Sequence, residues 1–168
     1  MPKPRPMSIL GLLACVCLLA YAFYMEHVLL LEPCPLCWLQ RFVFMGFAVV
    51  FFVCALQNPK GWGRYVYVLV FGLLTILGIG LAGRHLWLQS LPVEAQPECG
   101  LGITYMLDVK PLAEVIAWAA RGTGECAEIQ WSFAGVSIPG WTFIAYVILG
   151  ISIIVSLVRN PGQRRIFR

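Results

Sequence analysis

Charged side chains are scarce in this sequence: they make up 12% of its 168 residues, whereas apolar side chains make up 60%. Soluble domains average roughly 25% charged and 45–50% apolar residues. The mean hydropathy of +0.82 is correspondingly high. This composition excludes an ordinary soluble domain and predicts a membrane protein.

The sequence also lacks the motifs of several kinds of chemistry. It has no glycine-rich phosphate loop and no haem, flavin or iron–sulfur motif, and it contains only two histidines, His27 and His85. It shows no internal repeat and no low-complexity tract. These absences leave its seven cysteines as the main candidates for chemistry.

Four apolar stretches are long enough to cross a bilayer, at about residues 8–25, 38–56, 65–86 and 139–158. A spanning helix needs about 20 mostly apolar residues, because lipid offers backbone amides no partner outside their own segment. We therefore expect an all-α membrane protein, in which residues 1–168 form a single integral membrane domain built as a four-transmembrane-helix bundle.

The first apolar stretch has an alternative interpretation. Leu12-Leu13-Ala14-Cys15, with Lys3 and Arg5 upstream, resembles a lipoprotein processing site, which is typical of a cleaved signal. The apolar run continues beyond Cys15, however, and the run before Cys15 is short for a signal peptide. We therefore expect an uncleaved helix.

Charge predicts the orientation, because Lys and Arg accumulate in cytoplasmic loops. The two tails and residues 57–64 hold no acidic residue, and their basic residues are Lys3, Arg5, Lys60, Arg64, Arg159, Arg164, Arg165 and Arg168. Every acidic residue lies in or beside residues 26–37 and 87–138. We expect a bacterial inner-membrane protein with cytoplasmic termini and these two loops in the periplasm. The net charge of +4 reflects topology and indicates no nucleic-acid partner.

The second periplasmic loop contains a helical pattern. Leu112, Val115, Ile116 and Ala119 recur at spacings of three and four residues after Pro111. This pattern predicts a short amphipathic helix on the membrane surface. The alternative is ordinary loop structure packed on the bundle.

Topology sorts the cysteines into two groups. Thiols inside a helix usually behave as small, inert apolar groups, and this group is Cys15, Cys17 and Cys54. The cysteines on the periplasmic side are Cys34, Cys37, Cys99 and Cys126.

Cys34-Pro35-Leu36-Cys37 is a C-x-x-C pair just before the second apolar stretch. A ring this short constrains the unfolded chain less than a long one does, so redox exchange is the better interpretation. Cys37 should lie near a helix N-terminus, where unpaired amides favour a thiolate. Arg41, one turn later on the same face, is expected to hold that thiolate or to polarise a carbonyl of a bound acceptor. The alternative is an arginine that snorkels to the headgroups.

Cys99 and Cys126 flank the expected amphipathic helix, and glycines such as Gly100 adjoin them. Glycine-rich flanks indicate an accessible pair, although spacing alone is equally compatible with a structural disulfide. Glu125 and Glu128 surround Cys126. We expect their negative charge to raise the pKa of the Cys126 thiol and leave it the weaker nucleophile.

Arg84 and His85 adjoin the outer end of the third stretch. They are placed either to line one pocket with Arg41 or simply to anchor the helix end.

A disulfide relay needs an acceptor for two electrons. A lipid-soluble quinone, ubiquinone or menaquinone, fits by elimination, and disulfide exchange itself needs no further cofactor.

Essentially the whole chain resembles DsbB-type disulfide bond formation proteins. The resemblance lies in the four spans and in Cys34-Pro35-Leu36-Cys37-Trp38-Leu39-Gln40-Arg41, Ala82-Gly83-Arg84-His85, Pro97-Glu98-Cys99-Gly100, Gly124-Glu125-Cys126 and the stretch from Trp131 to Trp141. Two positions depart from the common pattern, which has glutamate where this chain has Gln40 and often Gly-Pro where it has Gly100-Leu101.

The resemblance implies a thiol:quinone oxidoreductase with two redox-active disulfides, Cys34/Cys37 and Cys99/Cys126. It implies that a reduced, periplasmic DsbA-like protein of thioredoxin fold attacks at Cys99, and that electrons then pass to the C-x-x-C pair. The resemblance also implies that Cys37 faces the quinone with Arg41 as its counter-group, and that Cys126 resolves the mixed disulfide or exchanges with Cys34.

Two other functions are compatible with parts of the pattern. The four periplasmic cysteines resemble a thiolate site of a membrane metal-binding protein, but the second C-x-x-C of most such sites is missing. A vitamin K epoxide reductase-like enzyme also couples a C-x-x-C pair in a four-helix bundle to a quinone. The pair of cysteines in the long loop favours the DsbB type.

Overall fold

The structure is a computed structural model that describes residues 4–59, 61–98, 100 and 103–159. Its long helices are α1 (Pro4–His27), α2 (Pro35–Gln57), α3 (Gly63–Gln89) and α6 (Ile138–Arg159). All four are long and apolar enough to cross a membrane. The chain is therefore an all-α, multi-pass membrane protein, whose helices extend one to four residues beyond the apolar stretches at each end.

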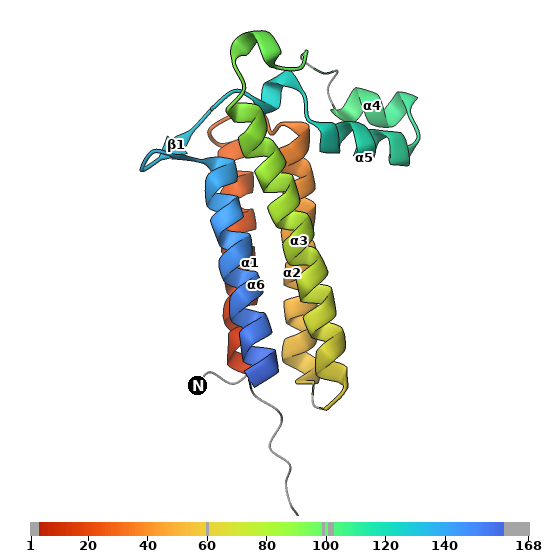
Figure 1. Ribbon diagram of the computed structural model, residues 1–168, viewed down its shortest axis with the longest axis vertical. Helices are drawn as coiled ribbons and strands as arrows, with labels where there is room; N and C mark the ends of the chain where they lie inside the picture. Colours follow the sequence, from red (N-terminus) through yellow and green to blue (C-terminus); the bar gives the residue numbers. More distant parts are fainter. Residues whose placement is uncertain (1–3, 60, 99, 101–102, 160–168) are drawn as a thin grey trace, which may run out of the picture.

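The long helices form a closed bundle in which α1 packs on α2, α2 on α3, α3 on α6 and α6 on α1 (Figure 1). The connection between α2 and α3 is short. Asn58 ends α2 in the left-handed conformation, with φ 43°, and its amide donates to the carbonyl of Cys54. Gly61 also has a positive φ, 61°. The chain direction therefore reverses within this short turn, and α2 and α3 are antiparallel neighbours.

The opposite end of the bundle carries residues 28–34 and 90–137, and we call it the loop end. Its elements are the turns η1 (Val93–Ala95) and η2 (Gly124–Cys126), the helices α4 (Ile103–Val109) and α5 (Leu112–Arg121), and a hairpin of β1 (Ser132–Phe133) and β2 (Val136–Ser137). Figure 1 shows α4 and α5 projecting to one side of the bundle and the hairpin to the other.

The expected amphipathic helix forms as α5, but only part of its apolar face is covered. Val115 and Ala119 are buried, and α5 packs against α2. Leu112 and Ile116 remain 64% and 48% exposed. The helix therefore packs on the bundle and also keeps apolar side chains at the surface, which combines the two interpretations of its sequence.

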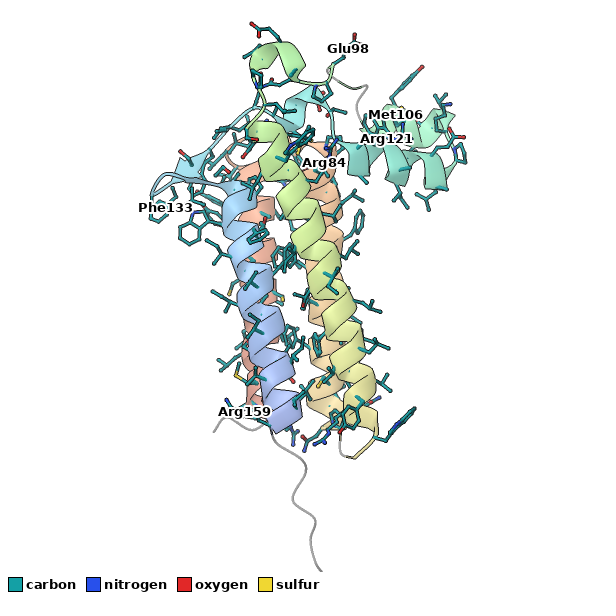
Figure 2. The ribbon with its side chains drawn as sticks, viewed as in Figure 1. Arg84, Glu98, Met106, Arg121, Phe133 and Arg159 are labelled. Atoms are coloured by element: carbon teal, nitrogen blue, oxygen red, sulfur yellow. The ribbon has the colours of Figure 1, made fainter. Side chains whose placement is uncertain are left out.

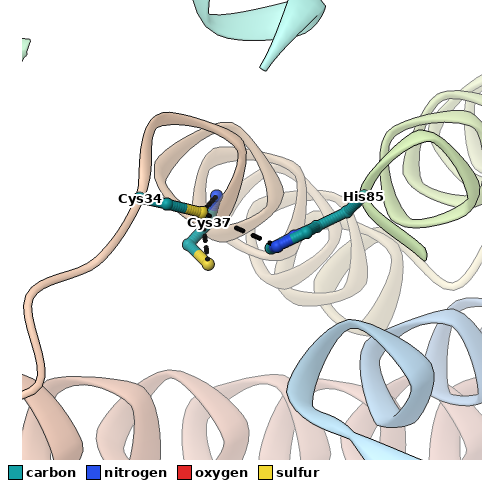
Figure 3. A group of neighbouring side chains, drawn as sticks. All are labelled: Cys34, Cys37 and His85. Carbon is teal, nitrogen blue, oxygen red and sulfur yellow. Dashed lines mark hydrogen bonds between the residues drawn. The ribbon is translucent and has the colours of Figure 1, made fainter. Parts of the chain in front are cut away.

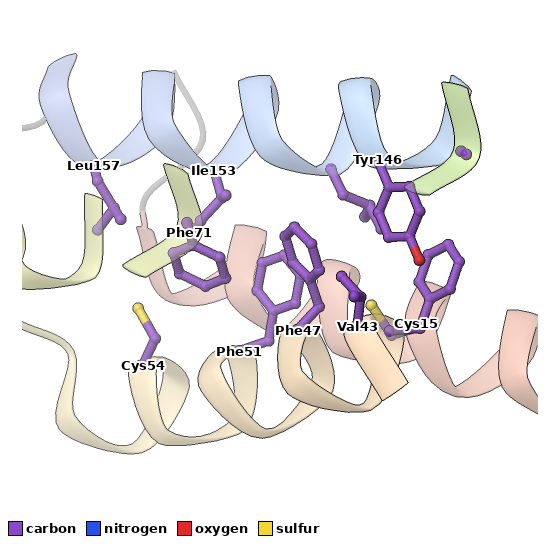
Figure 4. Packing of buried hydrophobic residues seen from close by; sticks show 12 residues of the cluster. Cys15, Val43, Phe47, Phe51, Cys54, Phe71, Tyr146, Ile153 and Leu157 are labelled. Atoms are coloured by element: carbon purple, nitrogen blue, oxygen red, sulfur yellow. The ribbon is translucent and has the colours of Figure 1, made fainter. Parts of the chain in front are cut away.

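An aromatic cluster fills the centre of the bundle (Figure 4). Phe47 lies 5.9 Å from both Phe51 and Phe71, ring centroid to ring centroid, and 6.0 Å from Tyr146. A Cβ at Gly78 of α3 would lie 2.7 Å from the Tyr146 ring, so the glycine makes room for it. Lipid is as apolar as these rings, so close packing, not the hydrophobic effect, holds the helices together.

The cysteines within the helices differ in burial. Cys15 and Cys54 belong to the buried core, and the hydroxyl of Ser8 donates to the sulfur of Cys54 at 3.4 Å. Cys17 is exposed, because it lies on a face of α1 that no other described helix covers. The expected burial therefore holds for Cys15 and Cys54, whereas Cys17 lies at the surface of the bundle, within a candidate membrane span.

We expect Phe47→Ala to lower the free energy of unfolding by about 3 kcal/mol, because it leaves a cavity among aromatic rings. Unfolding of the purified protein in mixed detergent measures the effect. The matched control is Phe52→Ala on the same helix, where the side chain is 52% exposed and should be nearly neutral. Equal effects of the two substitutions would contradict this account of the core.

Candidate active site

The C-x-x-C pair forms the first turn of α2. Cys34 is the N-cap residue, with extended backbone angles, and Pro35 occupies the first helical position, where no amide hydrogen is needed. The amide of Cys37 donates to the sulfur of Cys34 at 3.4 Å. The two sulfur atoms are 3.0 Å apart, so the pair is positioned to form and break a disulfide.

His85 of α3 completes a group of three side chains with this pair (Figure 3). Its Nε2 lies 3.8 Å from the sulfur of Cys34, and its ring is only 3% exposed. The three ligand atoms all lie within 4.8 Å of one another, a spacing that a metal ion also accommodates. From the sequence, His85 is expected either to line a pocket or to anchor the helix end; the structure brings it directly to the cysteine pair.

Gln40 orients His85 and was not identified as a site residue from the sequence. Its Nε2 lies 3.2 Å from Nδ1 of His85, while its Oε1 accepts from the hydroxyl of Thr142 at 2.7 Å. Gln40 is 3% exposed, and a buried polar side chain inside a membrane span is itself a functional signal. With the amide in this orientation, His85 carries its hydrogen on Nε2, toward Cys34.

Cys126 of η2 is fully buried and shares a hydrogen bond with Cys34. This hydrogen bond is the largest cause that lowers the pKa of Cys126 below its ordinary value; burial opposes it, and main-chain hydrogen bonds at Thr123 and Leu36 add to it. Hydrogen bonds to Cys126 and Cys37, together with burial, raise the pKa of Cys34. Cys126 is therefore the sulfur that ionises first of the two.

The expectation that Glu125 and Glu128 raise the pKa of Cys126 is wrong. Glu128 is exposed and Glu125 is half-buried, so solvent screens both charges. Hydrogen bonds from groups in direct contact with the sulfur outweigh them.

Gly122 allows the loop to descend onto the bundle just before η2. Its φ is 78°, a conformation that favours glycine. A Cβ there would lie 2.3 Å from a methyl group of Leu88 and 2.9 Å from one of Leu36. The close approach of the backbone places Cys126 against the start of α2.

Cys99 lies outside the described residues, so its predicted role stays a prediction. Its neighbours are described. The carbonyl of Glu98 accepts from the amide of Gly124 at 3.1 Å, and a Cβ at Gly100 would lie 2.6 Å from the side chain of Thr123. The chain on both sides of position 99 therefore contacts the segment that leads to Cys126.

Arg41 is buried and pairs with α1. It forms an ion pair with Glu26, donates to the carbonyl of Ala22 at 3.0 Å, and lies 5.2 and 5.5 Å from the ring centroids of Phe23 and Trp38. Glu26, which the sequence assigned to the first loop, belongs to the last turn of α1. The arginine thus has an acidic partner at the edge of the membrane that sequence reasoning missed.

Arg84 does not join this group. Its guanidinium donates twice to the carbonyl of Arg121, at 3.2 and 3.1 Å, and lies 4.3 Å from the centroid of Trp87. Figure 2 shows Arg84 and Arg121 together where α3 meets α5. Consecutive helical residues point about 100° apart, so His85 turns inward while Arg84 caps the C-terminus of α5.

A pocket opens beside the cysteine pair, between the ends of α2, α3 and α6 and the loop segment. It is lined by Cys34, Cys37, His85, Gln89, Glu125, Glu128, Gln130, Trp131, Ile138 and Pro139. Cys37 is half-buried whereas Cys34 is buried, so Cys37 is the sulfur of the pair that is more accessible to a reactant.

We expect the thiolate absorbance of Cys126, taken as the difference between reduced wild-type protein and Cys126→Ser, to persist well below the pH of about 8.5 at which an ordinary thiol ionises. In Cys34→Ala, which removes the largest cause of the lowered pKa, the midpoint should rise toward the ordinary thiol value. Cys17→Ser is the control. A wild-type midpoint near the ordinary thiol value of about 8.5 would contradict the hydrogen-bond assignment.

Comparison with known proteins gives matches over nearly the whole chain. The family model described as Disulfide bond formation protein DsbB matches residues 4–156. Disulfide bond formation protein B of Marinobacter nauticus is 51% identical over 158 residues, which cover 93% of this chain and 94% of the relative. The protein of that name from Nitrosococcus oceani is 49% identical over 153 residues, covering 91% and 90%. The chain therefore belongs to the DsbB family of disulfide bond formation proteins.

Proposed function

We propose that this membrane protein is a thiol:quinone oxidoreductase that reoxidises a periplasmic DsbA-like protein of thioredoxin fold and passes the electrons to a membrane quinone. The observation that carries the proposal is the position of Cys34. Its sulfur lies 3.0 Å from that of Cys37 and shares a hydrogen bond with Cys126. This position supports an exchange in which Cys34 is the sulfur shared between the proposed Cys34/Cys37 and Cys99/Cys126 disulfides.

Electrons enter at the Cys99/Cys126 disulfide. A thiolate of the reduced partner attacks the sulfur of Cys99, the disulfide breaks, and Cys126 leaves as a thiolate. A leaving thiol of low pKa departs faster, and while Cys34 is held in its disulfide the main-chain hydrogen bonds at Thr123 and Leu36 still lower the pKa of Cys126. The second thiol of the partner then attacks the mixed disulfide, which oxidises the partner and releases Cys99.

Electrons then move within the protein through Cys34. The Cys126 thiolate attacks the sulfur of Cys34, the Cys34/Cys37 bond breaks, and Cys37 leaves as a thiolate among the unpaired amides at the start of α2. Cys99 next attacks Cys126, which re-forms the Cys99/Cys126 disulfide and leaves Cys34 reduced. The net result is two electrons on the C-x-x-C pair.

A quinone, ubiquinone or menaquinone, supplies an acceptor for two electrons and two protons, and the residues around Cys37 fit one. Cys37 is half-buried and borders the pocket. Arg41, whose planar guanidinium has five N–H donors, is held between the rings of Phe23 and Trp38. We propose that Cys37, Arg41 and His85 contact the quinone and that Arg84, held at α5, does not.

The proposed orientation follows from charge. The loop end carries the cysteines of the relay, and in the periplasm it meets an oxidising compartment in which disulfides persist. The basic tails and the basic turn between α2 and α3 then lie in the cytoplasm. We propose that the protein resides in the bacterial inner membrane with this topology.

The relay is tested with purified protein in detergent, a reduced DsbA-like partner and either quinone. We expect quinone to be consumed in step with oxidation of the partner. Cys37→Ser and Cys99→Ser should each reduce turnover to background, whereas Cys17→Ser, at an exposed cysteine outside the relay, should not. Absence of turnover by the wild type with both quinones would refute the proposal.

The same assay tests Arg41. We expect Arg41→Lys, which keeps the charge opposite Glu26 but loses the planar fork, to raise the KM for quinone about tenfold, the loss of a charge-assisted hydrogen bond of about 1.5 kcal/mol. The rate of the first exchange with the partner should be unchanged. Arg84→Lys is the matched control. An unchanged KM in Arg41→Lys would exclude Arg41 from the quinone site.

A further inference from the structure

We propose that the reduced protein binds one zinc ion through the sulfur atoms of Cys34 and Cys37 and Nε2 of His85, and that the bound zinc holds the pair reduced. The binding does not depend on the proposed relay, since it needs neither partner nor quinone. It uses His85 of α3 as its third ligand and does not require Cys99. Soft thiolates with one imidazole form a ligand set that zinc accepts.

The geometry needs little adjustment. Tetrahedral zinc with bonds of about 2.3 Å to sulfur and about 2.0 Å to nitrogen places its ligand atoms about 3.5–3.8 Å apart. Nε2 of His85 and the sulfur of Cys34 are already 3.8 Å apart. The two sulfur atoms, at 3.0 Å, must separate by less than about 1 Å. Cys37 is half-buried and borders the pocket. Its side chain therefore has room to rotate, and this rotation can increase the distance between the two sulfur atoms.

The residues behind His85 suit a metal ligand. A coordinating histidine almost always donates its other ring N–H to a fixed acceptor, and here Nδ1 faces the amide of Gln40 at 3.2 Å. Turning that amide over presents Oε1 to Nδ1 and Nε2 to Thr142. The Thr142 hydroxyl also lies 3.0 Å from the carbonyl of Pro139, so it can donate there and accept from Gln40. Every polar group keeps a partner.

Charge favours a divalent cation at this position. Binding deprotonates both cysteines, releases two protons, and balances two thiolate charges with one zinc ion, without any change of oxidation state. Glu125 and Glu128 line the same pocket and add negative charge along the route of entry. Because the pocket adjoins both cysteines and His85, we expect a water molecule to be the fourth ligand. Sulfur atoms bound to zinc are not available to form the Cys34/Cys37 disulfide, so zinc selects the reduced state.

The test is titration of the full-length protein in detergent with zinc against a chromophoric chelator, without oxygen, partner or quinone. We expect one zinc ion per chain in the reduced wild type and none after oxidation of the pair. His85→Gln should weaken binding at least tenfold, and Gln40→Leu about 10- to 100-fold, the usual effect of removing the group that orients a metal-bound histidine. His27→Gln and Cys17→Ser are the matched controls.

Cobalt provides a second readout that does not depend on comparing variants. Reduced wild-type protein with Co2+ should show thiolate-to-metal charge-transfer absorbance, which zinc displaces. Equal zinc affinity in wild type and His85→Gln, stoichiometric binding by the oxidised protein, or no binding by the reduced protein would each overturn the proposal. A failed relay assay combined with normal zinc binding would refute the proposed function alone.

Discussion

The hydrogen bond from the hydroxyl of Tyr146 to the main-chain oxygen of Gln40, 2.7 Å long, joins α6 to α2 across the bundle. A phenol buried in a membrane protein must find a partner of this kind, because lipid offers none. The ring stacks on Phe44 at 4.3 Å and occupies the space that Gly78 leaves on α3. One side chain thus contacts three helices about one turn below the cysteine pair, next to the residue whose side chain reaches His85.

The sulfur atoms of the site are made unequal by their surroundings. Cys34 and Cys126 have the same intrinsic chemistry, yet Cys34 keeps its proton because it donates toward its neighbours, whereas Cys126 receives hydrogen bonds from Cys34 and from main-chain amides. Burial affects both. In the reduced protein this hydrogen bond makes Cys126 the sulfur that ionises first. The close approach of the loop at Gly122 brings the two sulfurs together.

Much of this could be predicted from the sequence, where the physics is local. Lipid forces apolar runs into helices, and Pro35 places the C-x-x-C pair at a helix start. Contacts between distant segments could not be predicted in this way. Arg84 and His85 are neighbours in sequence, but the rotation of α3 sends one to α5 and the other to Cys34. Gln40 acquires its role only through partners on α3 and α6.

The start of α2 has an unusual chemical property. Most helices begin at an oxygen-bearing side chain that accepts an amide hydrogen and does not change with redox state. Here the accepting atom is the sulfur of Cys34. A thiolate, a thiol and a disulfide sulfur accept such a hydrogen with different strengths, so the stability of the first helical turn varies with the oxidation state of the protein. The sulfur atom that caps this membrane helix is thereby also an atom that gains and loses electrons in the proposed relay.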